Sequence, residues 1–212
     1  MKKNIVRNII CVVCVIIIIL GVVLSIKPFR LKKILDKIDT YKDVENYYAK
    51  IETWEEEDNN SSEKKNFKTQ EILFKDGIMK MTLDNMVVWI NYNANEGYAI
   101  DLNKKEAKKL DAQLIKDYNA PDKDTISSFG PTILVDNFFD YYTTNLKIKS
   151  NDGYYVLYNE NDEYKIDKDT GLLELHTLKT STETQYTKYE INLNAVESNK
   201  IEMPNLSEYK II

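Results

Sequence analysis

The segment Ile9–Ile26 constrains this chain most, because it contains no charged residue over its whole length. Isoleucine, valine, leucine and cysteine fill the segment, and only Gly21 and Ser25 interrupt them. A helix rises about 1.5 Å per residue, so the segment nearly matches a hydrocarbon core roughly 30 Å thick. The sequence therefore predicts a transmembrane segment within residues 1–28, with Ile9, Ile16 and Ile26 among its membrane-anchor residues.

This segment could be an uncleaved signal anchor, a cleaved signal peptide or a lipoprotein signal. A cleaved signal peptide has a shorter apolar core of about 7–15 residues and small residues before the cut, and Val23-Leu24-Ser25 matches that site poorly. A lipoprotein signal needs a small-residue turn before its cysteine, whereas Cys11 and Cys14 lie inside the apolar run. The uncleaved anchor fits best, and cleavage stays open as the alternative.

Charge and composition bear on where the remaining chain lies. Three cations precede the apolar run and four follow it, so the charge rule alone does not set the orientation. A short basic N-terminus before one apolar run is the usual export arrangement, and many lysines with only two arginines indicate a bacterial source. We expect a single-pass protein of the cell membrane, with a domain over residues 29–212 outside the cytoplasm.

The composition of that domain excludes several classes of function. Residues 1–33 carry seven cations and no acid, so residues 34–212 have a net charge of −12. Nucleic-acid binding leans on cationic contacts to phosphate, which makes nucleic acid an unsuitable partner. Both cysteines lie in the anchor, so the domain has no disulfide and no thiol chemistry.

Alternating apolar and polar residues predict consecutive antiparallel strands behind a short helix over residues 29–39. Tight turns are expected at Asp76-Gly77 and Asp84-Asn85. Helical character is expected over residues 103–116 and in the second part of 125–145. The expected strands cover residues 44–55, 67–75, 78–83, 86–92, 98–102, 154–158, 163–167, 172–179 and 185–193. The fold class is α+β, an antiparallel sheet or partial barrel with helices against it.

The C-terminal third carries a family resemblance. Residues 164–173 (YKIDKDTGLL) form a strand–turn–strand pattern, residues 186–194 (YTKYEINLN) follow as another strand, and Ile201-Glu202-Met203-Pro204 comes near the end. This pattern resembles the LolA/LolB-like lipoprotein-carrier superfamily. The resemblance covers residues 30–212 in architecture and residues 163–206 in specific positions.

The resemblance implies a curved, unclosed half-barrel sheet wrapped around a few helices, whose concave side takes lipid acyl chains. Two departures argue against a shuttling carrier. The family's soluble carrier moves freely, whereas this chain carries an anchor. The carrier also has an arginine inside its cavity, and here no arginine follows Arg30.

No catalytic or metal-binding residue stands out. His176, the only histidine, falls on one expected strand face with Leu172, Glu174 and Leu178, and no nucleophile or metal motif accompanies it. The stretch from Asp167 to Gly171 lacks the glycine and glutamate spacing of an EF-hand loop, so turn chemistry explains it. We expect no enzyme activity and no cofactor.

The leading hypothesis is a membrane-anchored envelope protein that binds a lipid or a lipoprotein acyl chain in the concave face of its sheet. Methionine adapts to variable apolar guests, although methionine is more often found in a core. The alternative is a protein-interaction module of an envelope or sporulation-type complex, with a filled cavity and no lipid ligand. The candidate ligand-binding residues are Met79, Met81, Leu83, Val87, Trp89, Tyr98, Ile100 and Phe138.

Overall fold

The computed structural model describes residues 13, 16, 26–37, 44–57, 63–118 and 144–212. Ile9, Phe138 and the helix expected within residues 125–145 lie outside the described residues, as does most of the apolar run. No helix among the described residues is both long enough and apolar enough to span a membrane. The anchor therefore stays a prediction.

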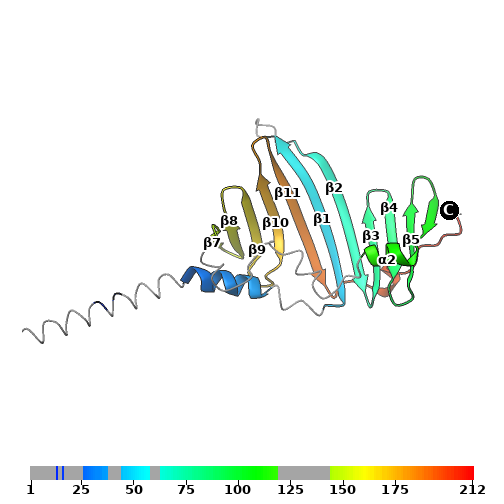
Figure 1. Ribbon diagram of the computed structural model, residues 1–212, viewed down its shortest axis with the longest axis horizontal. Coiled ribbons are helices and arrows are strands. Elements are labelled where there is room, and N and C mark those ends of the chain that lie inside the picture. Colours follow the sequence, from blue (N-terminus) through cyan, green and yellow to red (C-terminus); the bar gives the residue numbers. More distant parts are fainter. Residues whose placement is uncertain (1–12, 14–15, 17–25, 38–43, 58–62, 119–143) are drawn as a thin grey trace, which may run out of the picture.

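A single open, curved sheet of twelve strands dominates the described part of the chain (Figure 1). The spatial order is β12-β6-β5-β4-β3-β2-β1-β11-β10-β9-β8-β7. Neighbouring strands are antiparallel except β12 and β6, which pair in parallel. The strands are β1 (Asn46–Glu57), β2 (Lys65–Lys75), β3 (Ile78–Leu83), β4 (Met86–Asn91), β5 (Glu96–Asp101), β6 (Glu106–Lys109), β7 (Lys147–Asn151), β8 (Tyr154–Tyr158), β9 (Asp162–Asp167), β10 (Leu173–Lys179), β11 (Glu183–Leu193) and β12 (Lys210–Ile211).

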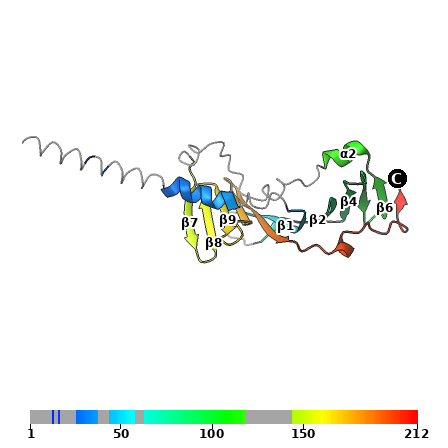
Figure 2. The ribbon, with the colours of Figure 1, turned by 90° about the horizontal axis from the view of Figure 1, so that it is seen from below.

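Among the described residues, the N-terminal helix and helix α2 lie on one face of the sheet, here called the helix face (Figure 2). The N-terminal helix, residues 26–37, packs Leu31 and Ile34 against a cluster of β8, β9 and β10 side chains that includes Leu157. Helix α2 (Ala112–Asp117) begins after Asp111, whose carboxylate accepts hydrogen bonds from two backbone N–H groups of its first turn. Its Ile115 joins the cluster over the centre of the sheet.

The C-terminal segment crosses the opposite face, here called the C-terminal face (Figure 2). Leu206 and Tyr209 pack on a small cluster of β4, β5 and β6 side chains. The buried Trp89 indole donates a hydrogen bond of 2.9 Å to the carbonyl of Ile201. Helix η2 (Ser198–Lys200) lies within this segment. The sheet is therefore covered on both faces around β4, β5 and β6.

The expected strands and tight turns are confirmed, but three strands were not anticipated. The helical expectation for residues 103–116 is wrong in its first half, which forms β6. Its four residues are mostly charged, and only the buried Ala107 faces the core. β7 and β12 are also short and mostly exposed, so they show almost no alternation of polarity.

Candidate functional site

A break in the pairing of β10 with β11 creates the candidate site. The described register of these strands runs from Leu175–Lys188 to Lys179–Thr184. β1 pairs with β11 much further, as far as Leu193. The last residues of β11 thus extend beyond the described pairing with β10, and a pocket of about 760 Å³ opens there. We call it the seam pocket.

The turn between β9 and β10 lies at the seam pocket and contributes Asp167, Asp169 and Thr170 to its lining. The Asp167 carboxylate accepts hydrogen bonds from the backbone N–H groups of Asp169 and Thr170 and from the Thr170 hydroxyl. Partial burial alone would raise the pKa of Asp167, but these bonds and nearby Lys37 outweigh it and lower that pKa. The carboxylate therefore stays ionised and keeps the turn closed.

Gly171 completes this turn in a conformation that an L-residue rarely adopts, with φ of +77°. A Cβ atom at this position would lie 2.6 Å from the Cβ of Lys37. The end of the N-terminal helix thus presses directly on the turn, and the Lys37 ammonium donates to the carbonyl of Lys168. A strand irregularity follows between Leu173 and Leu175.

The seam pocket has an apolar interior. Leu172, Leu173 and Trp54 are buried, and the other apolar lining residues are half-buried. The rings of Trp54 and Tyr186 stack with their centroids 5.1 Å apart and their planes 10° apart. The apolar lining consists of Trp54, Leu172, Leu173, Leu175, Tyr186, Tyr189 and Ile191.

The rim of the pocket is charged and net acidic. Lys165 forms a 3.2 Å ion pair with Glu174 and also lies 3.6 Å from the centroid of the Tyr154 ring. Glu190 and Lys188 are exposed. The charged lining consists of Lys165, Asp167, Asp169, Glu174, Lys188 and Glu190. An apolar interior inside a charged rim suits an amphiphile, whose tail and head need opposite surroundings.

The candidate ligand-binding residues of the sequence do not all lie on one face of the sheet, and their binding of a ligand stays a prediction. Met81 pairs with Val88, and both face the helices. Val87 and Trp89 therefore point to the C-terminal face, because successive residues of a strand alternate between faces.

The remaining candidates divide in the same way. Met79 lies with Met81 on the helix face, in the central cluster, and Leu83 is exposed at the end of β3. Tyr98 and Ile100 lie under the C-terminal segment with Val87. None of the described candidates lines the seam pocket.

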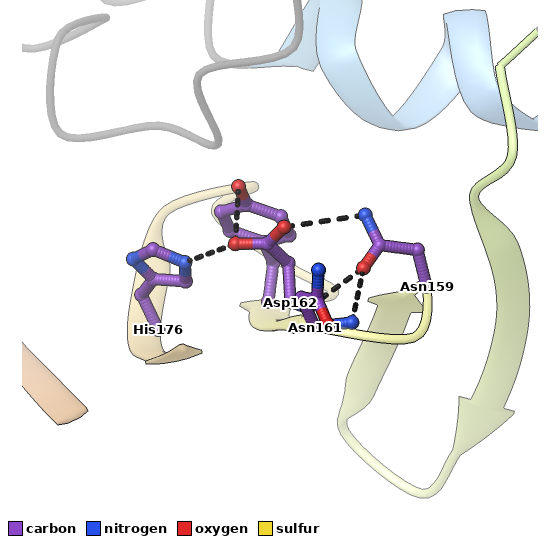
Figure 3. Close-up of polar contacts among 5 residues, drawn as sticks. Asn159, Asn161, Asp162 and His176 are labelled. Atoms are coloured by element: carbon purple, nitrogen blue, oxygen red, sulfur yellow. Dashed lines mark hydrogen bonds and ion pairs between the residues drawn. The ribbon is translucent and has the colours of Figure 1, made fainter. Parts of the chain in front are cut away.

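A polar cluster surrounds His176 of β10 and Asp162 of β9 (Figure 3). The imidazole Nε2 lies 3.0 Å from Oδ1 of Asp162 and its ring stacks on Tyr164 with centroids 4.5 Å apart. Asn159 donates to the other oxygen of Asp162 at 3.2 Å. These contacts bind the β8–β9 connection to β10. Within the described residues, no group of three or more His, Cys, Asp or Glu side chains could hold a metal ion.

The face expected for His176 needs one correction. Across the register, His176 pairs with Tyr164 and Leu173 pairs with Ile166, which places His176 and Leu173 on the helix face. The Glu174 side chain instead forms its ion pair with Lys165 at the pocket rim. The irregularity between Leu173 and Leu175 shifts the alternation by one residue. Two adjacent leucines, Leu172 and Leu173, were the signal in the sequence for this shift.

Comparisons with known proteins give likenesses of fold. No family model matches the chain, and no curated protein matches it. An uncharacterized conserved protein from Thermus thermophilus has a similar structure, with a TM-score of 0.44 and 9% identity over 86% of this chain and 98% of its own.

Two further structures are similar at lower scores. A LolA superfamily protein from Nitrosomonas europaea has a TM-score of 0.30 and 7% identity, over 81% of this chain and 97% of its own. MucB, solved in complex with MucA, has a TM-score of 0.33 and 14% identity, over 85% of this chain and 62% of its own. Structural neighbours of this chain thus include LolA superfamily proteins. These likenesses concern the fold alone and leave the function to the chain's own residues.

Proposed function

We propose that this chain is a membrane-attached, non-enzymatic protein of the bacterial cell envelope that binds a lipid or a lipoprotein acyl chain. The seam pocket is the binding site. One observation carries the proposal: a pocket of about 760 Å³ has an apolar interior and a charged rim. This volume lies within the range of about 300–1,000 Å³ that is typical of small-molecule sites.

Burial of the acyl chain supplies the driving force. Each methylene group removed from water contributes about 0.8 kcal/mol before the costs of association. Leu172, Leu175 and Ile191 offer aliphatic contact, and the stacked rings of Trp54 and Tyr186 offer a flat surface. The charged rim keeps the polar end of the ligand at the surface. Head-group contacts at the rim then orient the ligand.

The two tryptophans allow a direct test, because Trp54 lines the pocket and Trp89 lies under the C-terminal segment. The full chain is placed in phosphatidylcholine nanodiscs and titrated with dibrominated stearic acid, a short-range quencher. The Trp89→Phe variant retains only Trp54, and the Trp54→Phe variant retains only Trp89. We expect saturable quenching of Trp54 and little quenching of Trp89.

A matched pair of substitutions on β10 makes this test specific. Leu175→Phe adds volume to the pocket lining, whereas Leu178→Phe makes the same change on the helix face, outside the lining. In the Trp89→Phe variant, which retains only Trp54, Leu175→Phe should reduce the apparent affinity for the brominated stearic acid at least tenfold. Leu178→Phe should leave that affinity within about twofold. Equal quenching of the two tryptophans, or an unaffected Leu175→Phe variant, would refute the site.

The location is tested separately. A reporter that is active only outside the cytoplasm, fused after Ile212, should be active if the apolar run exports the domain. A reporter that is active only in the cytoplasm provides the reciprocal control. Activity of the second fusion and silence of the first would place the domain inside and remove the envelope from the proposal.

A further inference from the structure

The N-terminal helix has an exposed stripe on the side opposite its buried one. Leu31 and Ile34 are buried against the sheet. At about 100° per residue, positions 26, 29 and 33 fall on the other side of the helix, and position 30 lies at the border of that side, next to Ile34. All four are exposed. We call these residues, Ile26, Phe29, Arg30 and Lys33, the outer stripe.

The chemistry of the outer stripe is unusual for this chain. Phe29 is 59% exposed and Ile26 is 45% exposed, and the exposed cations Arg30 and Lys33 follow one and four residues after Phe29. Asp36 is also exposed on this side of the helix, but it forms a 2.7 Å ion pair with Lys32, so the pair adds no net charge. The stripe thus carries two positive charges, whereas residues 34–212 carry a net charge of −12. A partner of the stripe should be apolar and anionic at once.

The position of the stripe in the chain identifies that partner. The charge-free run ends at Ile26, and Phe29 to Lys33 follow within three to seven residues. At about 1.5 Å per residue, these side chains lie roughly 5–11 Å beyond the end of the run. The head-group layer of a bilayer begins where the hydrocarbon core ends and is roughly 5–8 Å thick on each side. If the run spans the membrane and the helix continues along it, Phe29 and Arg30 therefore fall at head-group depth, and Lys33 lies just beyond that layer, where its long side chain can reach back to the lipid phosphates.

We propose that the outer stripe lies on the anionic head groups of the membrane in which the chain is anchored. Phe29 and Ile26 enter the boundary between head groups and acyl chains, and Arg30 and Lys33 contact lipid phosphates. This inference rests on the membrane attachment proposed above, but not on the pocket. It places the start of the N-terminal helix at the membrane surface, and the strands beside this helix, β7–β9, then lie near the membrane (Figure 1).

The test places a tryptophan in the stripe of the full chain. The Phe29→Trp variant is reconstituted in nanodiscs of phosphatidylcholine with or without phosphatidylglycerol, using lipids brominated along the acyl chain. Phe67→Trp is the matched control, an exposed aromatic residue on β2. The parent emission from Trp54 and Trp89 is subtracted. In anionic discs we expect at least twofold quenching of the added tryptophan in the Phe29→Trp variant and no quenching of the one in the Phe67→Trp variant.

Charge dependence is tested with a second pair of variants. Arg30→Gln with Lys33→Gln, in the Phe29→Trp background, should reduce quenching in anionic discs to the level in neutral discs. Lys108→Gln with Lys109→Gln removes two exposed cations from β6 at the far end of the sheet and should change nothing.

Vesicle flotation separates the two proposals. Flotation of the Phe29→Trp variant without quenching of its added tryptophan would overturn the contact of the stripe and leave the membrane attachment intact. Quenching that does not depend on Arg30 and Lys33 would overturn the anionic partner. Failure to float would overturn both.

Discussion

Substitution of Gly171 by alanine should destabilise the protein more than the same change at any exposed turn. The alanine would have to keep a φ of +77°. Its Cβ would lie 2.6 Å from the Cβ of Lys37, whereas ordinary van der Waals contacts are 3.4–4 Å. The second atom belongs to the end of the N-terminal helix. The helix must therefore move by roughly 1 Å, or the turn must open.

The magnitude follows from two contributions. A left-handed conformation costs an L-residue roughly 1–2 kcal/mol, and alanine recovers about 0.4–1 kcal/mol by restricting the unfolded chain. Overpacking against the helix adds about 1–3 kcal/mol. Gly171→Ala should therefore lower the free energy of unfolding by about 1–4.5 kcal/mol. Gly153 provides the matched control, because its φ is +80° and nothing lies within 4 Å of its Cβ position.

Urea unfolding of the full chain in mild detergent, followed by tryptophan fluorescence, measures both variants. With a slope of about 2 kcal/mol per molar urea, the midpoint should fall by about 0.5–2.3 M for Gly171→Ala and by at most about 0.8 M for Gly153→Ala, so the difference reports the contact with the helix. Adding Lys37→Gly removes the clashing atom and should recover most of the difference, as in a double-mutant cycle. Equal midpoints for the two glycine variants would show that the helix does not press on the turn.

Three further outcomes are expected. Trp89→Phe removes the bond to the Ile201 carbonyl, so amide exchange over residues 201–212 should accelerate and stability should fall by about 1–3 kcal/mol; unchanged exchange would contradict this. Burial raises the pKa of Tyr92 to about 12, so the unfolded phenol ionises first and stability should decline as pH rises from about 10 to 12. Tyr92→Phe should flatten that decline, which an unchanged alkaline profile would disprove. Asp162→Ala breaks contacts with His176 and Asn159 and should lower the free energy of unfolding in urea by about 1–2 kcal/mol. A change near zero would show that this cluster does not stabilise the fold.

Most strands could be predicted because their alternation and their turns are local properties of the sequence. Asp76-Gly77 and Asp84-Asn85 each close a hairpin, and Asp76 and Asp84 both have positive φ values of 50°. The N-terminal helix was also predictable, since Leu31 and Ile34 recur at helical spacing and are buried. Short polar strands such as β6 were not, because pairing with a neighbour, rather than their own side chains, makes them strands.

The division of the candidate ligand-binding residues between the two faces of the sheet was predictable from the sequence. A two-residue turn at Asp84-Asn85 sets Leu83 opposite Met86, which fixes Met81 opposite Val88. Val87 must then face the other way. The seam pocket was out of reach, because it depends on where β10 stops pairing with β11. The turn beside this pocket also contacts Lys37, which lies 131 positions before Lys168, and no local pattern contains that contact.

That long-range contact links the two proposals physically. Lys37 is the last described residue of the helix that carries the outer stripe, and it touches both Gly171 and the carbonyl of Lys168 in the turn at the pocket rim. Overpacking at Gly171 must therefore move either the helix or the rim. If the rim moves, Gly171→Ala should weaken acyl-chain quenching of Trp54 even in urea-free buffer, whereas Gly153→Ala should not. If only the helix moves, quenching of Trp54 stays unchanged and quenching of a tryptophan at position 29 changes instead.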